Sequence, residues 1–347
     1  MTDPSFPAEI LHRIIGLAAK EDDNEYSTMK TCALVCYGLS KFCQQLMFED
    51  VQVNTTRGDI ANWNHPFLRL STAGFVKALS GHFGLSLGKA IWKLSFVISQ
   101  SDYDDALALQ QTLKAINHLE YLMVTQTGLK IPIEMRKLDA IGNTFKHLFE
   151  LPTLYAMCIS DFPVFSVGPG LKEIDLRASL PQPWEVFFKH PTTFSEHRPE
   201  LESMTFHGHA IPALKRLLSS RRTDGTPVVG LSNLKRVAVH TLTNATLFEC
   251  FSLASGSSVG LQEVAFMSQE IDENFLLYGG THIYTAIEPS LKTLKRLTLD
   301  LPFTGHKGDS IFIDFGSRRG AARRQVTEKE VQETEQQQER SIYPGVF

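Results

Sequence analysis

The chain has 347 residues, of which 43% are hydrophobic and 21% are charged, and its formal net charge at pH 7 is -4. This length favours two domains, and this composition is typical of a chain that buries a core and is not disordered throughout. The weak negative charge gives no global attraction to nucleic acid or to anionic membranes, and no apolar run reaches the roughly eighteen residues of a membrane span, so we expect neither partner.

Cysteine usage and the first residues bear on the compartment. Five cysteines, an odd number in a long chain, indicate reduced thiols and not a disulfide framework. The N-terminus lacks the charged stretch and apolar run of a secretory signal. We therefore expect a soluble protein of the cytoplasm, the nucleus or both.

Residues 1–53 predict three short helices. The first begins near Pro7, whose missing N–H is not needed in a first turn, and its apolar residues recur at helical spacing up to the acidic run 21–25. A second helix begins at Ser27 or Thr28, which can cap it. Gly38 is a stop signal before the third helix.

The predicted second helix is apolar on more than one side. At about 100° per residue, Leu34 and Val35 lie away from the face that carries Cys32 and Cys36. A unit of roughly fifty residues is marginally stable alone, so additional apolar surface indicates docking on a partner or on the rest of the chain.

From residue 91 a pattern of three apolar residues, apolar-x-x-apolar-x-apolar, recurs at intervals of about 30 residues, as in a solenoid. Its copies are Ile91/Leu94/Phe96, Leu119/Leu122/Val124, Leu154/Met157/Ile159, Leu171/Ile174/Leu176, Leu201/Met204/Phe206, Leu234/Val237/Val239, Leu261/Val264/Phe266 and Leu294/Leu297/Leu299. The two copies that begin at Leu154 and Leu171 are unusually close. The pattern predicts six to eight short parallel strands joined by right-handed crossovers.

The segments around these strands have distinct characters. Residues 54–90 form a linker that leads into the repeats. Amphipathic segments predict helices or loops between the strands, at 102–118, 133–151, 210–220, 242–254 and 271–294. After Phe315 almost nothing apolar remains, so residues 316–347 are expected to be a polar tail, either disordered or a loose helix.

Three blocks near the N-terminus, Phe6–Ile15, Met29–Cys36 and Leu46–Val51, resemble an F-box, in particular the F-box-like proteins of fungi. The resemblance covers about a seventh of the chain, and Phe6 and Phe48 depart from the usual leucine and tryptophan. It implies that the module binds the Skp-type adaptor of a cullin-RING ubiquitin ligase. The adaptor-binding residues that it implies are Phe6, Pro7, Ile10, Leu11, Ile14, Leu34, Val35, Cys36, Leu39 and Phe42.

The repeats resemble leucine-rich repeats, a common companion of the F-box. The asparagine or cysteine expected three residues past each strand is absent, so the repeats are degenerate. The expected fold class is α+β: a three-helix F-box-like module at 1–53, then an α/β leucine-rich-repeat-like solenoid with a parallel sheet at 91–315.

The resemblance implies a non-catalytic substrate receptor, which binds the adaptor through the module and an unidentified protein target through the repeats. The alternative is a leucine-rich-repeat-like interaction scaffold whose helices merely cap the first repeat and have no ligase role. The two differ in whether Pro7, Ile14, Leu34 and Val35 are exposed or packed against residues beyond 60.

Other motifs predict no cofactor, no metal and no catalysis. Cys32, Cys36 and Cys43 have the spacing of a helical core and lack a close Cys-x-x-Cys pair. His207 and His209 alternate on a strand end and so point to opposite faces.

Two further motifs resemble known sites only in part. The stretch 81–90 resembles a phosphate-binding loop but lacks its first glycine and its magnesium-binding hydroxyl. Asp102, Asp104 and Asp105 are predicted to favour a helix start, not calcium.

Overall fold

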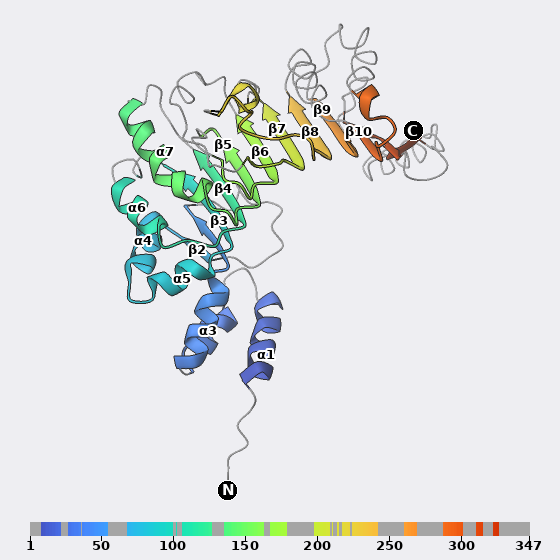
Figure 1. Cartoon of the computed structure of the whole chain (residues 1–347). Helices are drawn as coiled ribbons and strands as arrows, with labels where there is room; N and C mark the ends of the chain where they lie inside the picture. The colour runs from blue at the N-terminus through green and yellow to red at the C-terminus, as the bar shows by residue number, and fades with distance from the viewer. Residues whose placement is uncertain are drawn as a thin grey trace, which may run out of the picture. The chain divides into compact units, whose positions relative to one another are not determined.

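The computed structural model describes most of the first 178 residues and selected segments thereafter. The described residues are 8–21, 27–35, 37–54, 68–99, 102, 106–126, 135–162, 167–178, 198–208, 210, 214, 217–222, 224–241, 260–268, 287–300, 310–314 and 322–325. The chain divides into two compact units, Met1–Ile174 with Gln182–Pro199 and Asp175–Pro181 with Glu200–Phe347. Both mix strands with helices or turns, and Figure 1 traces the elements in chain order.

The first unit begins with a helical module made of α1 (Ala8–Glu21), α2 (Ser27–Ala33) and α3 (Tyr37–Met47). Its core consists of Ile15, Met29, Cys43 and Met47, all buried. Cys32 packs against this core, and so does Leu68 from beyond the module. Cys43 is therefore a core residue and Cys32 a partly buried neighbour of the core, while Cys36 lies outside the described residues.

The second helix is shorter than the pattern predicts. It ends at Ala33, and Leu34 and Val35 form a turn in which their N–H groups donate to the carbonyls of Thr31 and Cys32, each at 3.1 Å. Such bonds to the third residue back tighten a helix end. The prediction that Leu34 and Val35 lie on a helix is wrong, because the helix ends at Ala33.

Five parallel strands follow in the first unit, in the order β2-β1-β3-β4-β5. Their bounds are β1 (Asp50–Val53), β2 (Leu68–Leu70), β3 (Lys93–Ile98), β4 (Tyr121–Gln126) and β5 (Ala156–Ser160). The helices are α4 (Thr72–Ser80), α5 (Gly84–Ala90), α6 (Ala106–Leu113) and α7 (Met135–Phe149). The expected linker 54–90 thus contains β2, α4 and α5.

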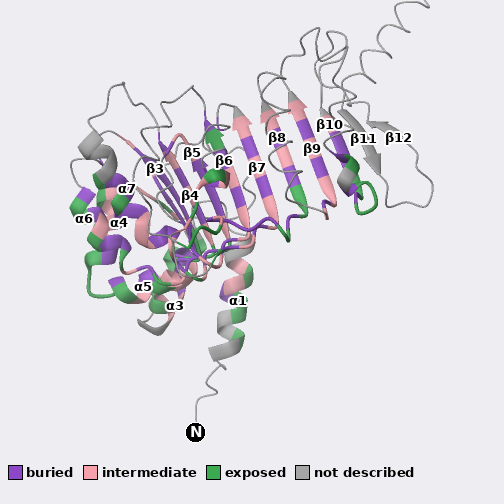
Figure 2. Cartoon of the chain, turned by 45° about the horizontal axis from the view of Figure 1, so that its top comes forward, coloured by how far each residue is buried: buried purple, intermediate pink, exposed green. Residues whose placement is uncertain are grey.

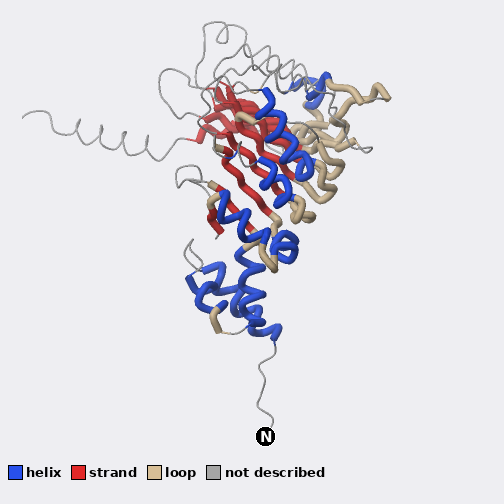
Figure 3. The backbone as a smooth tube through the Cα atoms, turned by 90° about the vertical axis from the view of Figure 1, so that its left-hand side faces the viewer, coloured by secondary structure: helices blue, strands red, loops and turns tan. Residues whose placement is uncertain are grey.

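A chain of aromatic rings joins these helices to the strands. Phe96 of β3 meets Phe75 of α4 edge-on, with ring centroids 6.1 Å apart, and Phe145 of α7 at 5.3 Å. All three side chains are fully buried. Edge-to-face contacts add to the burial of such large rings. Figure 3 shows the helices (blue) along one side of the strands (red).

A ladder of backbone hydrogen bonds connects the residues that directly precede β1, β3, β4 and β5. The carbonyl of Glu49 accepts from the N–H groups of Trp92 and Lys93, and the carbonyl of Trp92 accepts from Glu120 and the residue after it. The carbonyl of Glu120 in turn accepts from Tyr155 and its successor. Each of these strands is therefore held in register with the one before it.

The second unit contains the rest of β6 (Glu173–Ala178), from Asp175 on, and four further parallel strands, β7 (Ser203–Gly208), β8 (Arg236–Thr241), β9 (Glu263–Ser268) and β10 (Arg296–Asp300). A short 3-10 turn, η3 (Glu288–Ser290), precedes β10. Figure 2 shows buried and half-buried positions alternating along β7, β8 and β9, as expected of strands with one covered face.

Two antiparallel strands follow β10, namely β11 (Ser310–Asp314) and β12 (Ala322–Gln325). Residues 322–325 belong to the segment expected to be disordered or a loose helix, and for these four residues that expectation is wrong. Strand pairing satisfies backbone N–H and C=O groups and does not require apolar side chains, so the polar sequence gave no sign of it.

The prediction of parallel strands is confirmed. The second and third apolar residues of all eight copies lie in β3 to β10, including the closely spaced copies in β5 and β6. The predicted helices at 102–118 and 133–151 correspond to α6 and α7. The segment 242–254 and most of 271–294 lie outside the described residues.

A buried carboxylate holds three segments of the first unit together. Asp102, only 4% exposed, accepts hydrogen bonds from the N–H and Oγ of Ser99 at 2.7 and 2.8 Å. It also accepts from Thr72 Oγ1 at 2.6 Å and Asn54 Nδ2 at 3.3 Å. Asp102 thus joins the ends of β1 and β3 to the start of α4, whereas the sequence predicts that it favours a helix start. Asp104 and Asp105 lie outside the described residues.

Replacing Asp102 by alanine is expected to lower the free energy of unfolding by about 2 to 3 kcal/mol, because several buried donors lose their acceptor at once. Urea unfolding followed by circular dichroism measures the change. Asp224, whose carboxylate accepts hydrogen bonds from Thr226 in an exposed turn, supplies the control Asp224→Ala, which should change the transition much less. Equal effects of the two substitutions would contradict the bridging role.

Candidate functional site

Apolar side chains are exposed on two parts of the helical module. Ile10, Ile14 and Leu17 of α1 are 47%, 50% and 56% exposed, and their spacing places them on one side of the helix. Leu34 and Val35, in the turn after α2, are 87% and 71% exposed. We call these five residues the docking surface. Water is a poor environment for so much apolar area, and grouped exposure of this kind marks interaction sites.

The inward side of α1 is packed against the module, so the exposed side chains belong to a helix that is folded in place. Ile15, next to Ile14 in sequence, is only 3% exposed and belongs to the module's core. The helix is therefore docked through one face and leaves the other uncovered. Leu17 is not among the residues that the F-box resemblance implies.

The other residues implied by the resemblance divide into two groups. Leu39 and Phe42 of α3 are half-buried against the module's own core. Leu11 belongs to α1. Phe6, Pro7 and Cys36 lie outside the described residues.

A hollow of about 260 Å³ lies where α3, α5 and the residue before β3 meet. Its lining residues are Gln45, Glu49, Ser86, Lys89, Ala90 and Trp92. Trp92 is 47% exposed and meets His118 edge-to-face with ring centroids 5.4 Å apart. One acid and one base with two neutral polar groups give the hollow no strong preference for a charged ligand.

Asp50, at the start of β1, is a buried carboxylate beside Lys93, its register partner on β3. Its Oδ1 has no hydrogen-bond partner. Burial raises the pKa of Asp50 from 3.8 to about 6, and Lys93 opposes part of the rise. The raised pKa means that folding favours the protonated acid, so this group costs no stability below about pH 4 and costs most above pH 6.

Replacing Asp50 by asparagine is therefore expected to raise the free energy of unfolding by about 2 to 3 kcal/mol at pH 7.5 and to leave it unchanged near pH 4. Urea titrations at the two pH values measure the difference. Glu120→Gln is the control, since it neutralises an exposed carboxylate nearby. A gain that is the same at both pH values would show that charge burial is not its cause.

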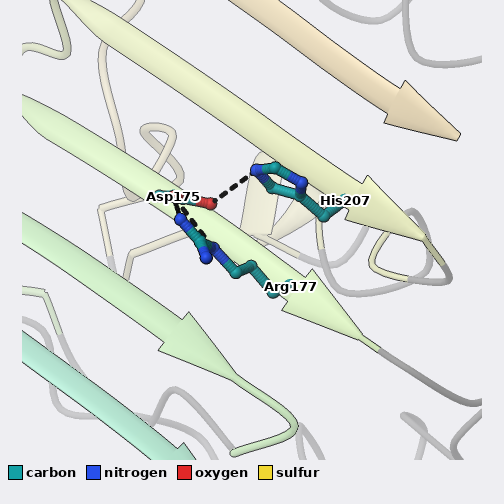
Figure 4. Close-up of polar contacts among 3 residues, drawn as sticks. All are labelled: Asp175, Arg177 and His207. Carbon is teal, nitrogen blue, oxygen red and sulfur yellow. Dashed lines mark hydrogen bonds and ion pairs between the residues drawn. The ribbon is translucent and has the colours of Figure 1, made fainter. Parts of the chain in front are cut away.

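A polar cluster occupies the strand face of the second unit (Figure 4). Arg177 donates to Asp175 Oδ2 from Nη2 at 2.7 Å and from Nε at 3.1 Å. His207 Nε2 lies 3.5 Å from Asp175 Oδ1, without the alignment of a hydrogen bond. On its other side His207 stacks on His240, with ring centroids 3.9 Å apart and planes 15° apart. The predicted neighbour His209 lies outside the described residues.

The polar cluster around Asp175 carries charged and polar side chains, whereas the docking surface is apolar. In the described part of the chain, no group of three or more His, Cys, Asp or Glu side chains has the geometry of a metal centre. No helix among the described residues is long and apolar enough to cross a membrane. The docking surface consists of exposed apolar side chains, a chemistry typical of interaction sites.

Compared with known proteins, the chain matches no family model and no curated protein.

Proposed function

We propose that the chain is a non-catalytic substrate receptor of a cullin-RING ubiquitin ligase. In this proposal the docking surface binds a Skp-type adaptor, and the strand repeats bind a protein target. The observation that carries it is the exposure of Leu34 at 87% and Val35 at 71%, together with that of Ile14 of α1 at 50%. These are three of the residues at which the F-box resemblance implies adaptor contacts.

The form of the surface supports the proposal. Leu34 and Val35 are held in a backbone turn by two hydrogen bonds, so they are presented without the cost of ordering a flexible segment. Bulky apolar side chains that become buried in a partner commonly supply most of the binding energy of an interface. The polar residues around them, such as Lys30 and Thr31, are exposed and suit an interface rim.

The alternative, an interaction scaffold whose helices only cap the repeats, also has an observation in its favour. Leu68 of β2 packs against the core of the helical module, so the module does cover part of that strand. Capping needs only the inward side of the module, however, and gives no reason for Ile10, Ile14 and Leu17 to face solvent. We therefore favour the receptor.

A receptor of this kind contributes no reacting group. It holds the target near the ubiquitin-transferring end of the ligase, and two binding surfaces in one chain raise the local concentration of one reactant around the other. The proposal places the protein where cullin-RING ligases act, in the cytoplasm, the nucleus or both.

Copurification tests the proposal. The tagged full chain, recovered from cells, should bring with it a Skp-type adaptor and a cullin in comparable amounts. Ile14→Asp should lose both and keep its other partners, because the change adds charge to the docking surface and leaves Ile15 in the core. Absence of the adaptor and cullin from the wild-type sample, with other partners recovered, would favour the scaffold.

A further inference from the structure

Exposed aromatic side chains lie at the starts of two strands of the first unit. Trp92 directly precedes β3 and is 47% exposed, and Tyr155 directly precedes β5 and is 45% exposed. Glu120, which directly precedes β4, lies between them and is also exposed. We call these three residues the strand-start row. Tryptophan and tyrosine are enriched at interfaces, because each combines a large apolar ring with a polar group.

Backbone hydrogen bonds hold the strand-start row in place. The carbonyl of Trp92 accepts from the N–H groups of Glu120 and the residue after it, and the carbonyl of Glu120 accepts from Tyr155 and its successor, at 2.9 to 3.1 Å. The three residues take the same position before parallel strands in register, and Figure 1 shows these strands side by side. A partner therefore binds the row without the cost of ordering a flexible segment.

Contacts between side chains follow the same line. The Trp92 ring meets the His118 ring edge-to-face, with centroids 5.4 Å apart, and His118 Nε2 lies 3.9 Å from Glu120 Oε1. The Tyr155 hydroxyl donates to Glu173 Oε1 at 3.3 Å. Trp92 also lines the hollow of about 260 Å³. Both aromatic side chains are thus steadied by a polar neighbour, while nearly half of each residue remains exposed.

The spacing of the row matches that of a polyproline II helix. Neighbouring strands lie about 4.8 Å apart, so two strand steps separate Trp92 from Tyr155 by about 9.6 Å. A polyproline II helix has three residues per turn and rises about 3.1 Å per residue, so every third residue returns to the same side after about 9.3 Å. Two prolines in the pattern Pro-x-x-Pro can therefore contact both aromatic residues at once. Aromatic-lined surfaces are a recurring means of binding such peptides.

The charges along the row favour one basic residue near its centre. Glu120 lies between Trp92 and Tyr155, and its side chain is 51% exposed. Two bases lie at the ends of the row, Lys89 in the hollow and Lys172 directly before β6. The row therefore attracts a cation at its centre and repels one at its ends. Exposed charge pairs contribute little affinity, but they determine register and specificity.

We propose that the strand-start row binds a proline-rich segment of a partner protein in the polyproline II conformation. The segment has the pattern Pro-x-x-Pro, with arginine or lysine at one of the two middle positions. One proline packs on Trp92, the other packs on Tyr155, and the basic side chain pairs with Glu120. This proposal is independent of the ligase proposal, because the row shares no residue with the docking surface and its test contains no adaptor.

Fluorescence anisotropy of a fluorescein-labelled, C-terminally amidated peptide, Ala-Pro-Pro-Arg-Pro-Pro-Ala, titrated with the purified full chain, tests the proposal. Saturable binding is expected. A peptide with alanine in place of every proline, or with glutamate in place of arginine, should bind about tenfold or more weakly. Trp92→Ala and Tyr155→Ala should each weaken binding about tenfold. Leu107→Ala, at an apolar side chain that is 69% exposed on α6, should not weaken it.

An exchange of charge separates recognition from an effect on folding. Glu120→Lys should weaken binding of the arginine peptide about tenfold and should bind the glutamate peptide better than the wild type does. Circular dichroism of each variant establishes that it is folded. A wild-type chain that shows no saturable binding up to about 1 mM would overturn the proposal. So would equal binding of the proline-free peptide, or a folded Trp92→Ala variant that binds as the wild type does.

Discussion

Replacing Leu34 and Val35 together by aspartate is expected to weaken the binding of a Skp-type adaptor about a thousandfold. Truncating a buried apolar anchor commonly costs about 2 kcal/mol or more, so two anchors cost roughly 4 kcal/mol, which corresponds to three orders of magnitude in Kd. Aspartate adds the penalty of placing charge in an apolar interface. Biolayer interferometry with the immobilised adaptor measures the change.

The same substitution should leave the fold intact, because both side chains are exposed in a turn and neither belongs to the module's core. A matched control is the pair Leu85→Asp and Leu107→Asp, at apolar side chains that are 74% and 69% exposed on α5 and α6. The control pair should bind the adaptor as the wild type does. Loss of circular dichroism in the Leu34/Val35 variant would show that these residues support the interior, as in the capping alternative.

Replacing Gly84 by alanine is expected to lower the free energy of unfolding by about 3 kcal/mol. Gly84 is the first residue of α5, and a Cβ there would overlap the backbone carbonyl of Leu79 in α4. Backbone on both sides leaves no flexible side chain that could move aside. Urea unfolding followed by circular dichroism measures the loss.

Gly16, inside α1, supplies the contrast. A Cβ at Gly16 would meet nothing within 4 Å, so Gly16→Ala should raise stability by up to about 1 kcal/mol through helix propensity alone. Equal effects of the two substitutions would contradict the close approach of α4 and α5. A second close approach accounts for Gly88 in the same helix, because a Cβ there would overlap the backbone carbonyl of Ala115.

The strands of the repeats could be predicted because three buried positions in fixed register leave a pattern in the sequence. The strand β1 carries the same signal, since Phe48, Val51 and Val53 have the required spacing and are all buried. Those residues also fall within the expected helical module 1–53, so the sequence alone does not separate β1 from it. The strand β2 has only three residues and no such pattern, so its strand conformation depends on pairing with β1.

The docking surface was predictable in part. Residue types and the F-box resemblance pointed to Leu34 and Val35, and their exposure agrees with the expected separation from the cysteine face. The structural reason for their exposure differs from the predicted one, because Leu34 and Val35 lie in a turn and not on a helix. Side-chain pairs across strands were beyond prediction, since His207 meets His240 only through a register that hydrogen bonds between strands determine.

Hydrogen exchange of the full chain, with and without a purified Skp-type adaptor, tests the central claim most directly. Binding through the docking surface should slow exchange in α1 (Ala8–Glu21) and at residues 27–35, and leave β7 to β10 unchanged. Unchanged exchange in α1 and residues 27–35 at saturating adaptor would contradict the receptor function.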